Sequence, residues 1–160
     1  GFTHQQVLGR LYILFNDYFR DSAKCVPVLS PFDIQLVRNS IRRKRSTDED
    51  DINVVQPDLV VLCNYEKDMN EEDRYTGTPD LAVEILSPSS RGKDKIKKMD
   101  LYMDAGIGEF WVVDPEKRSI AVYTFEDHDL AHDAVFTEGE RAGSMLFPDL
   151  EADVGLVLAR

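Results

Sequence analysis

The sequence predicts a mixed α/β fold, also described as α+β, in which helices flank a central sheet. Two stretches, one near the N-terminus and one between the SPSS motif of residues 87–90 and Gly106, carry apolar residues at helical spacing. Several short stretches rich in Val, Leu and Ile have the length and composition of strands. The second helical stretch connects two of these strands, which is the arrangement of a right-handed crossover between parallel neighbours.

Length and composition indicate one soluble globular domain over residues 1–160. Of the chain, 42% is hydrophobic and 31% charged, and no apolar run reaches the roughly 18 residues that a membrane span needs. The N-terminus lacks the pattern of a secretion signal, so we expect a cytoplasmic protein without a membrane partner. Cys25 and Cys63 have no partner at metal-site spacing, and we expect buried thiols of a reducing compartment.

The first element expected is an amphipathic helix that begins just before His4. Its apolar stripe recurs at intervals of three and four over residues 7–19, and Thr3 is available as N-cap. Residues 32–38, FDIQLVR, alternate apolar and polar side chains and predict a strand. Residues 54–63, VVQPDLVVLC, predict a second strand that is entered through a proline.

The middle of the chain predicts a strand, a helix and a further strand. LAVEIL, residues 81–86, is apolar enough to be buried on both faces of a sheet. The SPSS of residues 87–90 ends this strand and supplies N-caps for a helix that stops at Ala105-Gly106. EFWVVD, residues 109–114, is the strand that follows.

Beyond this unit the pattern becomes weaker. A turn at Asp114-Pro115 leads to a strand at residues 119–125, and the tail suggests short strands or a final helical turn. The cluster EDHDLAHD, residues 126–133, places His128 and His132 four apart among acids, a spacing that suits zinc on a helix. The cluster lacks an apolar frame, so we expect a solvated loop there.

Two carboxylates, Asp58 and Glu84, stand in otherwise apolar strands. An unpaired ionised carboxylate is costly to desolvate in such a place. Mg²⁺, with Mn²⁺ as a substitute, meets this cost by binding carboxylate oxygens and retained waters, and two strands can contribute to one ion. The alternative is a structural pair between each carboxylate and an Arg or Lys. Asp80 lies about 13 Å from Glu84 along an extended strand, so we expect it at the strand entrance.

A metal ion held between carboxylates needs a nearby cationic side chain if it is to act on a phosphate group. Leu86 occupies the position two residues after Glu84, where a lysine on the same strand face would stand. A long side chain from the following helix could reach back over the strand end, orient a water and neutralise phosphate charge. The candidates in that helix are Lys93, Lys95, Lys97 and Lys98.

The chain contains PDLVVL, then PDLAVEILSPSS, then a helix with Asp94, Lys98 and Tyr102 at intervals of four, then AGIGEFWVVDPE. This series resembles the Uma2 family, within the restriction-endonuclease-like PD-(D/E)XK superfamily. The resemblance covers essentially the whole chain, from Thr3-His4-Gln5 to the final FPDLEADVGLVL, and its middle block is the most specific part.

The resemblance implies a restriction-endonuclease-like mixed sheet flanked by helices and a Mg²⁺-dependent nuclease that hydrolyses phosphodiester bonds, with DNA the expected nucleic acid. It implies Asp58 and Glu84 as metal ligands and catalytic residues, and Lys98 as the catalytic lysine with Lys95 in reserve. Cleavage of both strands of a duplex implies a homodimer. The chain departs from the family pattern in two ways. Its candidate lysine lies on the helix instead of the strand. The further glutamate that precedes the first helix in family members would lie before Gly1.

Charge favours a second interpretation. The net charge of −11 weakens sequence-independent binding to phosphates. RRKR at residues 42–45 is either a phosphate-contacting loop or a tip neutralised by DEDD at residues 48–51. The alternative function is therefore a catalytically degenerate member of the fold that acts as a dimeric interaction or regulatory module. We expect Tyr102 and Trp111 in the core, and Gln35 on the solvated face or lining the site.

Overall fold

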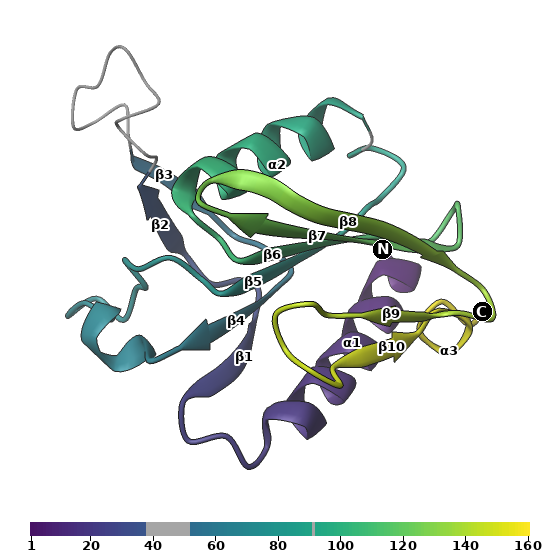
Figure 1. The fold of residues 1–160 in the computed structure, drawn as a ribbon, viewed down its shortest axis with the longest axis horizontal. Coiled ribbons are helices and arrows are strands. Elements are labelled where there is room, and N and C mark those ends of the chain that lie inside the picture. Colours follow the sequence, from purple (N-terminus) through teal and green to yellow (C-terminus); the bar gives the residue numbers. More distant parts are fainter. Residues whose placement is uncertain (38–51, 91) are drawn as a thin grey trace.

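A six-stranded mixed sheet forms the centre of the molecule in the computed structural model, which describes residues 1–37, 52–90 and 92–160 (Figure 1). Its strands, in spatial order, are β1 (Cys25–Leu29), β4 (Leu59–Cys63), β5 (Leu81–Ile85), β6 (Glu109–Asp114), β7 (Ser119–Glu126) and β8 (Asp129–Thr137). Only β5 and β6 run parallel within this sheet, and the other neighbours are antiparallel. The predicted fold class is confirmed.

Helices and two small sheets surround this centre. The helices are α1 (Phe2–Phe19), α2 (Lys93–Ala105), the short α3 (Val154–Val157) and a 3-10 turn, η2 (Tyr65–Asp68). The small sheets pair β2 (Ile34–Val37) with β3 (Ile52–Val55), and β9 (Arg141–Gly143) with β10 (Glu151–Asp153).

Each face of the central sheet has its own apolar core, because successive side chains of a strand point to opposite faces. The α1 face receives Val83 of β5 and Trp111 of β6, and the Trp111 ring meets Phe15 of α1 edge-on at 5.3 Å between centroids. The α2 face receives Phe110, which meets Tyr102 of α2 at 4.9 Å. Strands buried on both faces explain why β5 and β6 are continuous apolar runs.

Helix α2 joins β5 to β6, as the sequence predicts. In this parallel pair Glu84 lies opposite Val112, and the helix ends at Gly106, whose φ of 89° is a left-handed C-cap that glycine adopts without strain. The crossover sets α2 over one end of β5.

Two boundaries differ from the sequence-based expectation. Helix α1 begins at Phe2, so Thr3 lies inside the first turn and Gly1 is the N-cap. The stretch expected as one strand over residues 54–63 is two strands, because β3 ends before the buried Pro57 and β4 begins after it. Proline has no N–H for a ladder, and the two strands pair with different partners.

The expected loop at residues 126–133 is wrong. Asp127 and His128 have φ values of 50° and 64°, which form a tight hairpin turn, and β8 starts directly after them. His132 lies in β8 opposite Thr124, while His128 contacts the Asp104 carbonyl oxygen through Nδ1 at 3.0 Å. The two histidines are therefore not on one helix face, and the zinc alternative loses its geometric basis.

The expectation of two free thiols is also wrong. Cys25 of β1 lies opposite Cys63 of β4, and the two form a disulfide. The sequence did not predict β1, so it gave no sign that residues 38 positions apart in the chain would be strand partners. Among the residues that the structure describes, no helix is long and apolar enough to cross a membrane.

Candidate active site

Asp58 is held at the point where β4 begins. Because β4 runs antiparallel to β5 with Leu59 opposite Val83, Asp58 comes next to Glu84 at the end of this ladder. The backbone N–H of Ile85 donates to Asp58 Oδ2 at 2.8 Å. On the other oxygen, His4 Nε2 from the first turn of α1 lies 3.1 Å from Oδ1. Residues from three separate elements thus meet around one carboxylate.

Glu84 is buried in β5 and is met by two side chains from α2. The Tyr102 hydroxyl donates to Glu84 Oε1 at 2.8 Å, and Lys98 Nζ lies 3.1 Å from Oε2. Lys98 and Tyr102 are four residues apart, so both point from the same face of α2. Helix α2 therefore brings an ammonium group to Glu84, whereas Leu86, two residues after Glu84, is apolar.

Burial has the largest effect on the pKa values of Glu84 and Tyr102. Desolvation raises the pKa of Glu84 above its ordinary value; Lys98 opposes the rise and the neighbouring charge of Asp58 adds to it. Burial, together with the charge of Glu84, also raises the pKa of Tyr102, so its phenol stays a neutral donor to the carboxylate. The strand register, which sets Asp58 beside Glu84, accounts for the unfavourable effect of Asp58 on Glu84.

The structure separates the lysine candidates. Lys98 contacts Glu84, whereas Lys95 places its ammonium 5.8 Å from the centre of the Tyr123 ring, although both line a small cavity beside Glu84. Lys97 is exposed. The side chains of Lys93 and Asp94 lie outside the described residues.

Other predicted positions lie apart from the carboxylate pair. Asp80 accepts a hydrogen bond from the Cys63 N–H at 2.8 Å, so it sits at the strand entrance as expected, and burial raises its pKa. Gln35 belongs to β2, outside the six-stranded sheet, and its N–H donates to the Tyr75 carbonyl. Tyr102 and Trp111 are fully buried, as predicted. The basic stretch at 42–45 and the acidic stretch at 48–51 lie outside the described residues.

The donor set can be compared with the needs of a divalent cation. Each of the four carboxylate oxygens of Asp58 and Glu84 has at least one polar partner among the described residues, and a carboxylate oxygen can accept more than one. Within residues 1–37, 52–90 and 92–160, no three or more His, Cys, Asp or Glu side chains are grouped to hold a metal ion. Two carboxylates fit Mg²⁺, which usually keeps several waters and binds few protein ligands.

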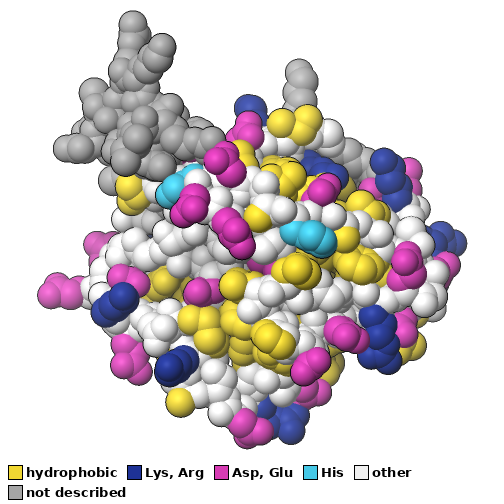
Figure 2. All heavy atoms as spheres, in the orientation of Figure 1, with side chains coloured by type: hydrophobic (Ala, Val, Ile, Leu, Met, Phe, Trp, Pro, Cys, Tyr) yellow, Lys and Arg dark blue, Asp and Glu magenta, His cyan; other side chains and the backbone are white. Residues whose placement is uncertain are grey.

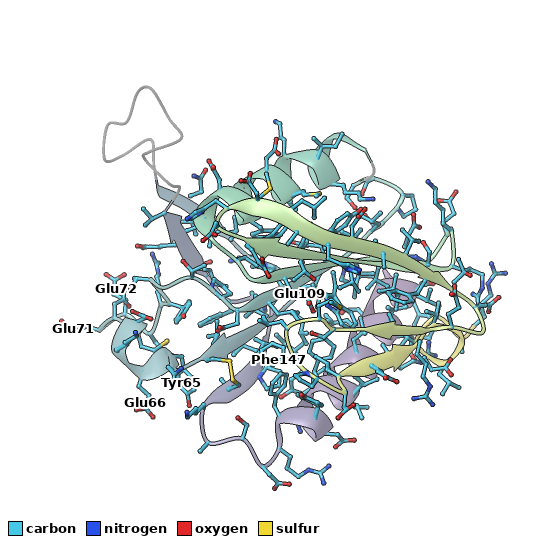
Figure 3. All side chains as sticks on the ribbon, in the orientation of Figure 1. Tyr65, Glu66, Glu71, Glu72, Glu109 and Phe147 are labelled. Atoms are coloured by element: carbon cyan, nitrogen blue, oxygen red, sulfur yellow. A yellow bond between two sulfur atoms is a disulfide. The ribbon has the colours of Figure 1, made fainter. Side chains whose placement is uncertain are left out.

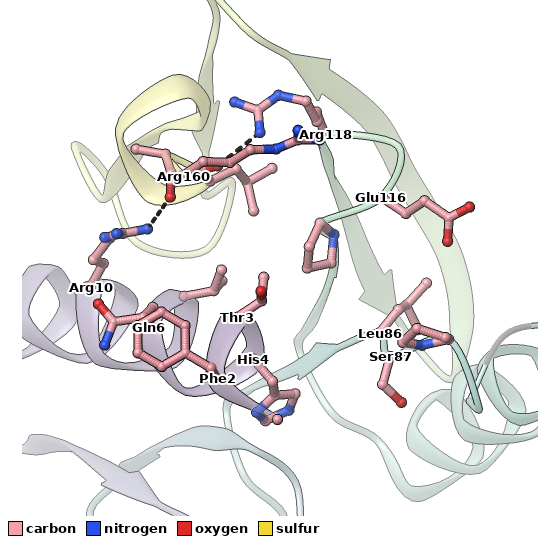
Figure 4. A pocket seen from close by; sticks show the side chains of 16 residues that line it. Phe2, Thr3, His4, Gln6, Arg10, Leu86, Ser87, Glu116, Arg118 and Arg160 are labelled. Carbon is pink, nitrogen blue, oxygen red and sulfur yellow. Dashed lines mark hydrogen bonds between the residues drawn. The ribbon is translucent and has the colours of Figure 1, made fainter.

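A groove of about 890 Å³ opens beside this site (Figure 4). Its walls are the first turns of α1, residues 86–88 after β5, the turn between β6 and β7, and residues 158–160. His4 belongs to this lining as well as to the contact with Asp58. The guanidinium groups of Arg10 and Arg118 also line it and donate to the carbonyl oxygens of residues 157–159.

Comparisons with known proteins show which family and which solved structure this chain is similar to. The family model of Uma2, described as "Putative restriction endonuclease", matches residues 1–155. The chain belongs to the Uma2 family. A crystal structure from Anabaena variabilis ATCC 29413, described as a putative nuclease belonging to DUF820, has 17% sequence identity and a TM-score of 0.70. The match covers 98% of this chain and 80% of that one, and it shows a shared fold. Curated proteins include no match.

The sequence did not predict two contacts of this Uma2 site. His4 marks only the start of a helix in the sequence, although its ring nitrogen Nε2 lies 3.1 Å from Asp58 Oδ1 in the structure. A polar residue on the first turn of an amphipathic helix is normally solvated, so the pattern gave no signal. Tyr102 was expected in the core, and only the structure shows that its hydroxyl ends on Glu84.

Proposed function

We propose that this Uma2 protein is a Mg²⁺-dependent nuclease that hydrolyses phosphodiester bonds of nucleic acid, with DNA as the favoured substrate. The observation that supports it most is the meeting of Asp58 and Glu84 at the end of β5 with the Lys98 ammonium 3.1 Å from Glu84. Structural ion pairs also bury carboxylates, but two acids side by side repel each other and lower the stability of the fold without a cation.

In this proposal Asp58 and Glu84 would hold the ion through their remaining lone pairs. Bound Mg²⁺ lowers the pKa of a coordinated water and offsets phosphate charge. Tyr102 keeps Glu84 in one orientation, and the Ile85 N–H does so for Asp58. Lys98, whose side chain is 40% exposed, keeps its ammonium at the edge of the site, where it can contact a substrate phosphate or orient a water.

The alternative is a catalytically degenerate protein of the same fold that acts as an interaction or regulatory module. One observation favours it: Lys98 already neutralises Glu84, and His4 already contacts Asp58. The acidic net charge of −11 points in the same direction.

Cation binding separates the two functions. We expect Mn²⁺ or Mg²⁺ to raise the melting temperature of the wild-type chain, because a ligand that binds only the folded state stabilises it. Glu84→Ala should not respond, whereas Glu126→Ala, a change of an exposed glutamate, should respond as wild type does. Plasmid and single-stranded substrates would then be tested for cleavage. A wild-type protein that neither responds to the ions nor cleaves would support the degenerate function.

A further inference from the structure

We propose that His4 is a positioning residue for this reaction, which holds the Asp58 carboxylate beside Glu84 and thereby sets the cation affinity of the site. This inference rests on the proposed function. The contact that carries it is the 3.1 Å separation between His4 Nε2 and Asp58 Oδ1.

The geometry around Asp58 supports this role. Rotation about the last side-chain bond of an aspartate is weakly restricted, so one hydrogen bond alone does not fix the carboxylate plane. Here Oδ2 accepts from the Ile85 N–H at 2.8 Å and Oδ1 is met by His4. Contacts on both oxygens, from different elements, leave the carboxylate one orientation. Both side chains are largely shielded, with exposures of 25% for His4 and 16% for Asp58.

The contact with His4 counteracts the repulsion between Asp58 and Glu84. The charge of Asp58 acts unfavourably on Glu84, so an unrestrained Asp58 would turn away from it toward solvent. A site that shares one cation between two carboxylates needs both to stay in place before the cation binds. The Ile85 N–H holds Asp58 Oδ2, and His4 contacts the other oxygen, Oδ1.

A merely structural role, tying α1 to the sheet, does not account for the contact. Helix α1 already buries Val7, Leu8, Leu11, Phe15 and Phe19 in the core. Arg10 adds hydrogen bonds to the carbonyl oxygens of Val157 and Ala159. The helix is therefore anchored along its length without His4.

Three variants test the inference. His4→Ala removes the contact. His4→Gln keeps a nitrogen donor at about the reach of Nε2, so a positioning role predicts rescue. Gln5→Ala changes the exposed neighbour on the same helical turn and controls for effects on the helix itself.

The first measurement needs no metal. Because the Ile85 N–H donates to Asp58, its hydrogen exchange, followed by NMR, reports whether Asp58 stays in place. We expect exchange about tenfold faster in His4→Ala, and near wild-type rates in His4→Gln and Gln5→Ala. Unchanged exchange in His4→Ala would overturn the inference.

The second measurement is Mn²⁺ affinity by calorimetry. We expect His4→Ala to bind Mn²⁺ about 10–100-fold more weakly, the usual cost of losing a group that orients a ligand, and His4→Gln to recover most of it. Equal affinity in His4→Ala and wild type contradicts the inference while leaving the nuclease proposal intact. If wild type binds no Mn²⁺, the nuclease proposal fails and, with it, the link from His4 to cation affinity; the Ile85 exchange rate still decides whether His4 holds Asp58.

Discussion

Glu84 is buried, and its carboxyl group is paired with Lys98. We expect Lys98→Met to lower the free energy of unfolding by about 1–2 kcal/mol, less than for a fully buried pair because Lys98 is partly exposed. Lys95→Met removes the contact with the Tyr123 ring and should cost about 0.5 kcal/mol or less. Urea unfolding at pH 7 measures both variants.

The same two variants test which lysine serves the reaction. Under the proposed function, Lys98→Met abolishes most cleavage and Lys95→Met retains most of it, since only Lys98 contacts Glu84. Equal losses of activity in the two would show that the contact with Glu84 does not select the catalytic lysine.

Asp80 should make stability depend on pH. Burial raises its pKa above the ordinary value of 3.8, so the folded protein binds this proton more tightly than the unfolded chain does. The resulting stabilisation is fully present below pH 3.8 and is lost as the pH rises through the higher pKa of the folded state. Wild type should therefore gain stability relative to Asp80→Asn as the pH is lowered from 7 toward 4.

Urea unfolding at a series of pH values measures that difference. Asp21→Asn, at an exposed position, is the matched control and should follow wild type throughout. Parallel pH profiles for wild type and Asp80→Asn would show that Asp80 titrates alike in the folded and unfolded chain.

Among contacts between elements, Glu109, the first residue of β6, bonds to the loop between β9 and β10. Figure 3 shows its side chain within the molecule, and it is fully buried. Its Oε1 accepts from Trp111 Nε1, and its Oε2 accepts from the Thr124 hydroxyl and from the N–H groups of Met145 and Leu146. Four donors thus satisfy the two carboxyl oxygens of this buried side chain.

Glu109→Gln should destabilise the fold, because the amide NH₂ must face one of these donors. We expect a loss of about 1–3 kcal/mol in the free energy of unfolding, the range for a buried polar group left without its partner. Chemical denaturation measures it, and the exposed Glu126→Gln is the control, with a change near zero. A similar effect of both substitutions would mean that the four donors contribute nothing specific.

The disulfide between β1 and β4 is the second link between elements. Closing a loop between residues 38 apart restricts the unfolded chain, and the chain-entropy relation gives a stabilisation of about 4 kcal/mol at most. We expect reductant to lower the free energy of unfolding by about 2–4 kcal/mol. The Cys25→Ser, Cys63→Ser double variant should match the reduced protein and be insensitive to reductant. Sensitivity of that double variant would point to an effect of the reductant elsewhere.

At the scale of the molecule, acidic and basic side chains are interspersed with apolar ones on the face in Figure 2, without one dominant basic region among the described residues seen there. Acidic side chains prevail in the whole chain, with 30 Asp and Glu against 19 Lys and Arg. Under the proposed function, we therefore expect binding to nucleic acid to rest on local contacts rather than on a general attraction to phosphates.

The homodimer that cleavage of both strands of a duplex would require can be tested by the products formed from a plasmid. A monomer cuts one strand per encounter, whereas two sites related by a two-fold axis can cut both. We expect nicked plasmid to accumulate at low protein concentration and linear plasmid to form directly at high concentration. Sedimentation over the same concentrations should show the change from monomer to dimer. A product ratio independent of concentration would contradict a dimer formed in this range.

The edges of the sheet show where local pattern is insufficient. The inner strands β5, β6 and β7 follow from composition alone, because burial on both faces demands apolar runs. The edge strands β1 and β8 were missed. β1 contains Pro27, which an edge strand tolerates because one side of it has no ladder. β8 is mostly exposed, and its apolar and polar residues do not alternate regularly.

Periodicity and composition, which are local properties of the chain, predicted the fold class, the crossover through α2, and Asp58 and Glu84 as candidate ligands. Lys98 was singled out from four lysines by the resemblance to the Uma2 family. Tertiary structure decided the Lys98–Glu84 contact over Lys95, the meeting of His4 with Asp58, and the disulfide between Cys25 and Cys63. Each of these joins residues from different elements, so each depends on strand register and helix placement, which only the packing of the whole chain fixes.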